Sequence, residues 1–176
     1  MNIVSAFTLF ALLLGSVGGA QQKSGNEGIH AACPMMHQSD SDLMHRGEEG
    51  MGFSQTSTTH HFLLKSDGGI IQVEVNDPSD ADQLADVRMH LHHIAAAFQE
   101  GDFNIPMFVH DTTPPGEPEM KRHRNEIRYR VEETKAGGRV IVSTTDKDAI
   151  EAVHKFLLFQ IQEHKTGDPQ EIPQPD

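Results

Sequence analysis

The sequence predicts an α+β fold in which duplicated β-β-α units form a four-stranded, mainly antiparallel sheet with two helices on one face. Two stretches, "HHFLLKSDGGIIQVEVND" and "NEIRYRVEETKAGGRVIVSTTD", each contain two short strand-like runs around a Gly-Gly turn, as in a β-hairpin. Each stretch is followed by a segment with helical periodicity. One hairpin–helix unit, present twice, therefore accounts for the whole predicted fold.

The strands and helices of these units are predicted from separate periodic patterns. In the second hairpin, apolar residues alternate as in a half-buried strand: Ile127, Tyr129 and Val131, then Val140, Val142 and Thr144. The helical segments follow Asp77 and Asp146, and acidic residues favour a helix N-terminus. Their apolar stripes, which we expect to cover the sheet, are Leu84, Val87, Leu91, Ile94 and Phe98 in the first, and Ile150, Val153, Leu157 and Ile161 in the second.

Composition divides the chain into four parts. We expect a signal peptide over residues 1–20, a flexible arm containing Met, His and Cys over 21–57, the globular domain over 58–166 and a disordered tail over 167–176. Within the globular domain, residues 101–120 form a long loop between the two units, followed by a short helix over 121–124. Loops of this length often carry function.

The first twenty residues predict export. Residues 3–14 are apolar, and Gly18-Gly19-Ala20 supplies the small residues that favour cleavage before Gln21. A membrane-spanning helix is the competing interpretation, but the run is shorter than the roughly 20 apolar residues that a bilayer requires. The mature protein is therefore expected in the periplasm or outside the cell.

Charge and motif content exclude several functions. The net charge of −12 repels phosphate backbones and anionic lipid headgroups, so nucleic acid is not an expected partner. The sequence contains no Gly-x-Ser-x-Gly elbow, phosphate-binding Gly loop, Cys-x-x-Cys pair or His-Glu-x-x-His helix. We therefore expect that the protein is not an enzyme. Its single Cys cannot form an intrachain disulfide, so the thiol is free, paired to another chain or bound to a ligand.

The stretch "CPMMHQSDSDLMHRGEEGM" in the predicted arm is rich in soft ligands. Thiolate and thioether groups are soft and imidazole is borderline, so this set suits Cu(I) far better than magnesium or calcium. The repeat of Met36-His37 as Met44-His45 would let a flexible arm wrap one ion. The alternative is a Met-rich contact surface for a protein partner. The candidate donors in the arm are Cys33, Met35, Met36, His37, Met44, His45 and Met51.

A second candidate site consists of residues in the folded part. Aligning the two hairpins turns His60 toward the helices and His61 away from them, and His90 and His93 are three apart on the first helix. With Met107 and His110 from the loop, these residues form a plausible site for copper or zinc: His60, His61, His90, His93, Met107 and His110.

Two alternatives to this folded site stay open. The histidines could be ordinary core-boundary residues bonded to backbone carbonyls. Non-covalent haem with His or Met axial ligands is a further possibility, since the chain has no Cys-x-x-Cys-His motif. His154 and His164 are ten residues apart on the last helix, so they are expected on different faces and not in one site.

The five residues "CPMMH", 33–37, resemble the Cys-Pro-Met-His heavy-metal-binding motif of copper-efflux proteins, with one additional Met. This resemblance implies copper binding by Cys33, Met35, Met36 and His37. The globular part is similar in layout to uncharacterised exported bacterial proteins with two hairpin–helix units, which implies the fold but no activity.

Together these observations lead to one hypothesis and one rival. The hypothesis is an exported protein that binds copper for delivery, storage or resistance. The rival is a metal-free interaction module that docks a membrane-associated or secreted protein through its Met-rich arm or its helical face.

Overall fold

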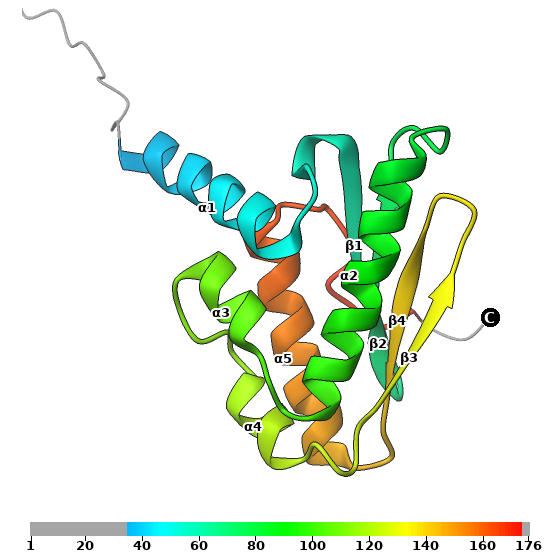
Figure 1. The fold of residues 1–176 in the computed structure, drawn as a ribbon. Helices are drawn as coiled ribbons and strands as arrows, with labels where there is room; N and C mark the ends of the chain where they lie inside the picture. The colour runs from blue at the N-terminus through cyan, green and yellow to red at the C-terminus, as the bar shows by residue number, and fades with distance from the viewer. Residues whose placement is uncertain (1–34, 174–176) are drawn as a thin grey trace, which may run out of the picture. The chain divides into compact units, whose positions relative to one another are not determined.

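The computed structural model describes residues 35–173, and for residues 35–40 it describes the backbone alone. The expected signal peptide and Cys33 lie outside the described residues. Figure 1 shows two long helices packed on one side of a sheet. None of the described helices has both the length and the apolarity needed to cross a bilayer.

The sheet confirms the predicted α+β class. Its strands are β1 (Thr58–Lys65), β2 (Gly68–Val75), β3 (Arg128–Glu133) and β4 (Gly137–Ser143). They pair in the order β1-β2-β4-β3, and every pairing is antiparallel. Each hairpin is followed by its long helix, α2 (Ala81–Gln99) and α5 (Lys147–Glu163). The duplicated β-β-α plan is therefore present, with the two hairpins joined through β2 and β4.

The core lies between the sheet and the two long helices. Phe62 and Leu64 of β1 are buried, and so are Val140 and Val142 of β4. Helix α2 lies mainly against β2, β3 and β4, whereas α5 lies against β1 and β2. Both helices begin at an Asp cap: Asp80 accepts a hydrogen bond from Gln83 N, and Asp146 accepts one from Ala149 N.

The segment between the two units differs from the loop that the sequence predicts. It contains α3 (Asn104–His110) and α4 (Glu117–Arg122), so the short helix begins four residues before the expected residue 121. Helix α3 forms because Pro106, Val109 and His110 share a buried face, which tertiary packing stabilises despite the short length. Its burial brings His110 into the interior.

The expected flexible arm also differs from the structure, since residues 35–51 form α1 (Met35–Met51), followed by the short helix η1 (Gln55–Ser57). Helix α1 packs on α3, and Arg46 Nε donates a 2.9 Å hydrogen bond to Val109 O. A Cβ at Gly50 would lie 3.2 Å from side-chain atoms of Phe108 and Val109, so glycine permits this close approach. Composition alone gives no indication of this tertiary contact.

The C-terminal segment likewise departs from the expected disorder. The Asp168 carboxylate accepts hydrogen bonds from Phe62 N at 2.9 Å and from His61 Nδ1 at 2.8 Å. These bonds hold the chain after α5 against β1. A polar, Pro-rich composition predicts weak packing, but it cannot reveal a specific carboxylate contact of this kind.

Candidate functional site

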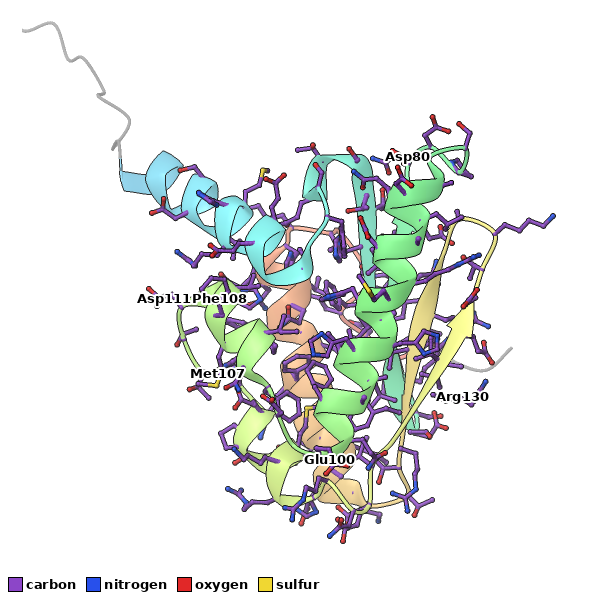
Figure 2. The ribbon with its side chains drawn as sticks, in the orientation of Figure 1. Asp80, Glu100, Met107, Phe108, Asp111 and Arg130 are labelled. Atoms are coloured by element: carbon purple, nitrogen blue, oxygen red, sulfur yellow. The ribbon has the colours of Figure 1, made fainter. Side chains whose placement is uncertain are left out.

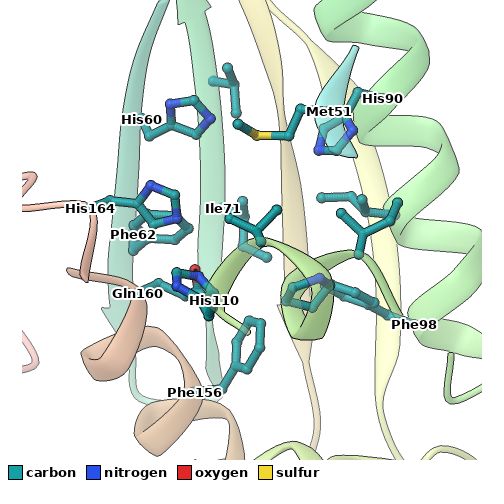
Figure 3. A pocket seen from close by; sticks show the side chains of 15 residues that line it. Met51, His60, Phe62, Ile71, His90, Phe98, His110, Phe156, Gln160 and His164 are labelled. Carbon is teal, nitrogen blue, oxygen red and sulfur yellow. The ribbon is translucent and has the colours of Figure 1, made fainter. Parts of the chain in front are cut away.

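A cavity of about 60 Å³ lies between the sheet and the helices, and four histidines line it. Figure 3 shows these imidazoles together with Met51 and Gln160 around a wall of aliphatic and aromatic side chains. The polar and sulfur-bearing members of the lining are Met51, His60, His90, His110, Gln160 and His164. The lining contains no Asp, Glu, Lys, Arg, Ser, Thr or Cys.

Each imidazole comes from a different element. His60 is in β1, where it pairs with Val73 and shares the inner face with Phe62. His90 is on the buried face of α2, His110 is the last residue of α3, and His164 caps the C-terminus of α5. The cluster therefore exists only in the folded chain.

Two of these imidazoles have a ring nitrogen that is buried without a partner. His110 Nε2 donates a 2.9 Å hydrogen bond to Gln160 Oε1, which leaves its Nδ1 with a lone pair. Among the described residues, neither His110 Nδ1 nor His60 Nε2 has a hydrogen-bond partner. Because a buried polar atom without a partner costs free energy, each nitrogen is a candidate for ligand binding.

The spacing of three rings is compatible with one shared ion. The ring centres of His60 and His164 are 5.6 Å apart, and those of His110 and His164 are 5.1 Å apart. Imidazoles that share an ion at 2.0–2.1 Å in tetrahedral geometry have ring centres roughly 5 Å apart. The fold therefore places the His164 ring at a suitable separation from His60 and from His110.

In this structure the ring nitrogens do not point toward one common centre. Among the described residues, no three of these imidazoles have ring nitrogens all within 4.8 Å of one another. The rings of His60 and His164 are stacked at 12°, so their nitrogens do not point at one common centre. Joint coordination of one ion therefore requires the rings to turn about their side-chain bonds, a motion that needs no change of fold.

Burial keeps the imidazoles neutral at neutral pH. It lowers the pKa of His60 and of His90 to about 4, and that of His164 to about 3. Repulsion between neighbouring imidazolium charges lowers these pKa values further. Burial also lowers the pKa of His110, against the opposing effect of its hydrogen bond to Gln160. Neutral imidazole is the form that binds metal ions.

The other predicted site residues of the folded domain lie outside this cavity. His61 is on the opposite face of β1 and bonds to Asp168. His93 is exposed, because its offset of three residues from the buried His90 carries it past the edge of the apolar stripe of α2. Met107 is 37% exposed on α3. The structure therefore brings together His60, His90 and His110, and leaves out His61, His93 and Met107.

The donors of the expected arm do not converge either. Met44 and His45 are exposed on α1, and the backbone of α1 also carries Met35, Met36 and His37. Met36-His37 and Met44-His45 are eight residues apart, which on a helix corresponds to about 12 Å. One ion cannot be wrapped by both pairs while α1 is helical. Cys33 is outside the described residues.

Two members of the cavity wall, Gln160 and His164, were not expected there. His154 Nε2 donates a hydrogen bond to Lys65 O outside the cavity, which agrees with the expectation that His154 and His164 lie on different faces of α5. A useful indication was available: Phe156, Gln160 and His164 recur at four-residue spacing and so share one face of α5. Met51 was grouped with the arm, and its place in the cavity depends on the packing of α1.

A second group of possible ligands lies at the surface. His123, Asp146 and Asp148 have ligand atoms within 4.8 Å of one another, and His123 Nδ1 is 3.5 Å from Asp146 Oδ1. Asp146 already caps α5, and Asp148 is exposed in the first helical turn, where acidic residues are favoured without any ion. The His-lined cavity is the better-supported candidate site.

Comparison with protein-family models, curated proteins and solved structures finds no match for this chain.

Proposed function

We propose that this protein is an exported copper carrier that binds one ion in the cavity through His60, His110 and His164. The observation that supports the proposal most directly is the pair of buried ring nitrogens, His60 Nε2 and His110 Nδ1, which have no partner among the described residues. His164 lies between these two rings, with centres 5.6 Å and 5.1 Å away. Ion binding would satisfy nitrogens that the fold otherwise leaves without a partner.

The size of the cavity favours an ion over a cofactor. A water molecule occupies at least about 10–15 Å³ on the same measure. The cavity of about 60 Å³ therefore has room for an ion with a few small ligands, and too little room for a haem macrocycle. Borderline imidazole ligands suit copper and zinc, and copper binds more tightly to a given nitrogen site.

The lining favours binding over catalysis. It lacks any Ser, Thr, Cys or Lys that could act as a nucleophile, and it lacks a carboxylate that could orient a histidine base. The cluster resembles a ligand shell more than a catalytic apparatus. Export is part of the proposal because of the apolar run and small residues at the start of the chain.

The test is metal titration of the purified protein by competition with a chelator for copper and for zinc. Single substitutions of His60, His110 or His164 by Phe retain a planar ring and remove the ligand, so each should weaken copper binding about tenfold or more. The matched control is His93→Phe on the exposed side of α2. Copper affinity that is unchanged in all three cavity variants would contradict the proposed site.

A metal-free interaction module is the second candidate, because the neighbouring helices α1 and α3 expose large apolar side chains. Met44, Met107 and Phe108 are 44%, 37% and 45% exposed, and Figure 2 shows Met107 and Phe108 beside α3 on the side away from the sheet. Met is common at adaptable interfaces. Under this alternative, changing these three residues to Ser abolishes capture of a membrane-associated or secreted protein partner and leaves copper tolerance of the cells unchanged.

A further inference from the structure

The end of α1 reaches the His-lined cavity. Figure 3 shows the Met51 side chain pointing into the cavity, with its sulfur on the side of the imidazoles. Two residues later, the Phe53 ring stacks on His60 with centres 6.1 Å apart and meets the edge of His90 at 5.4 Å. The segment after α1 thus brings a thioether and an aromatic ring directly onto two of the imidazoles.

The packing of α1 on the domain would allow the helix to move as a unit. Its main contacts are with α3 and η1, and Arg46 Nε to Val109 O is the side-chain hydrogen bond that links it to α3. The chain leaves the helix at Gly52, whose φ of 81° lies in the left-handed region. Besides Arg46, Gln55 Nε2 holds α1 by a 3.0 Å hydrogen bond to Met44 O. Because neither bond involves the sheet or the long helices, α1 can separate from α3 while the sheet, α2 and α5 keep their packing.

The charge of the cavity restricts the ion that it can hold. Its lining contains neutral imidazoles, one amide, one thioether and apolar groups, and no carboxylate to offset positive charge. The electrostatic cost of burying an ion rises with the square of its charge, so a dication is about four times as costly as a monocation. Thioether sulfur adds a preference for a soft ion, and Cu(I) satisfies both conditions.

From these observations we infer that Met51 is the fourth ligand of the proposed site, that the site takes Cu(I) in preference to Zn(II), and that α1 is a lid which closes when the Met51 thioether binds the ion. This inference rests on the proposed function.

The test compares Met51→Leu with Met44→Leu in the full chain. Leu retains the size of the Met51 side chain and removes its sulfur, and Met44 is an exposed position on the same helix. Cu(I) and Zn(II) affinities are measured anaerobically by chelator competition. We expect Met51→Leu to weaken Cu(I) binding about tenfold or more and to leave Zn(II) binding unchanged, and Met44→Leu to alter neither.

Lid closure has its own readout in limited trypsin digestion. Arg46 lies on α1, and Lys135 is exposed in the turn between β3 and β4. Cu(I) should slow cleavage after Arg46 and leave cleavage after Lys135 unchanged in the wild type, and this protection should disappear in Met51→Leu. Equal protection of both sites would indicate general stabilisation and would overturn the lid.

The possible failures can be told apart. If Met51→Leu binds Cu(I) as the wild type does while His164→Phe does not, the inference is wrong and the proposed function stands. If Zn(II) binds more tightly than Cu(I) in the wild type, the assignment of the ion is wrong. If the wild type binds neither ion, the proposed function is wrong, and so are the roles inferred for Met51 and α1.

Discussion

Acid should unfold the metal-free protein at a pH well above the range in which typical domains unfold. The buried imidazoles have folded-state pKa values of about 4 for His60 and His90 and about 3 for His164, against 6.5 for the free side chain. A lowered pKa means that the folded state resists protonation. Below pH 6.5 these histidines are protonated in the unfolded chain and stay neutral in the folded chain. The free energy of unfolding therefore falls as the pH drops from 6.5 toward 4.

The size of the effect follows from these values. At pH 5, a histidine whose pKa changes from 6.5 in the unfolded chain to about 4 in the folded chain loses about 2 kcal/mol of stabilisation. Three such groups together lose about 6 kcal/mol, which is comparable to the whole stability of a typical domain, about 5–15 kcal/mol. We therefore expect cooperative unfolding near pH 5.

The assay is urea denaturation followed by circular dichroism at pH 7, 6 and 5 in the presence of a chelator. His164→Phe retains an aromatic ring next to Phe62, which is 5.5 Å from His164, and it removes one of the three buried titrating groups. This variant should lose about one third less stability than the wild type between pH 7 and 5. His45→Phe at an exposed position of α1 serves as control. A free energy of unfolding that stays constant from pH 7 to 5 would refute the reasoning.

Three further predictions concern packing and binding. Tyr129→Phe removes a buried hydroxyl that has no partner among the described residues, so it should raise the free energy of unfolding by about 1 kcal/mol in chemical denaturation. Gly116→Ala should lower it by about 3 kcal/mol or more and reduce the melting temperature, because φ is 86° and the new Cβ would lie 2.1 Å from Ala152 O. Free Cu(I) at 100 times the dissociation constant should stabilise the wild type by about 2.7 kcal/mol in a thermal scan and His110→Phe much less, and equal stabilisation of both would contradict the site.

The parts of the fold that sequence could predict are those with strong local periodicity. Alternation on both sides of each Gly-Gly pair predicts both hairpins, although the turns lie at residues 66–67 and 134–136 and each Gly-Gly pair begins the second strand of its hairpin. Alignment of the hairpins turns His60 inward, where it lines the cavity. The stripes from Val87 to Phe98 and from Val153 to Ile161 are buried as expected. Each of these patterns arises from contacts that one strand or helix makes within the core. The sheet itself is predicted by the presence of the hairpin twice in the sequence.

The parts that sequence could not predict depend on contacts between distant segments. Helix α1 is mainly polar, and its position depends on a contact between Arg46 and Val109, which are 63 residues apart. His164 faces His60 because a short β-strand and the end of a helix meet in space. No window along the chain contains both His60 and His164, so their proximity could not be read from composition or spacing.

The position of Asp168 bears on whether copies of this protein associate through the edge of the sheet. Strand β1 is at the edge of the sheet, and the backbone N–H of Phe62 points away from β2 toward the Asp168 carboxylate. An edge strand with free N–H groups is a template on which another chain can add a strand. Because Asp168 occupies this N–H donor, the C-terminal segment hinders the addition of a strand from another copy of the chain to the edge of the sheet. We expect proteolytic trimming ahead of residue 168 to free this donor and so to favour intermolecular β-structure.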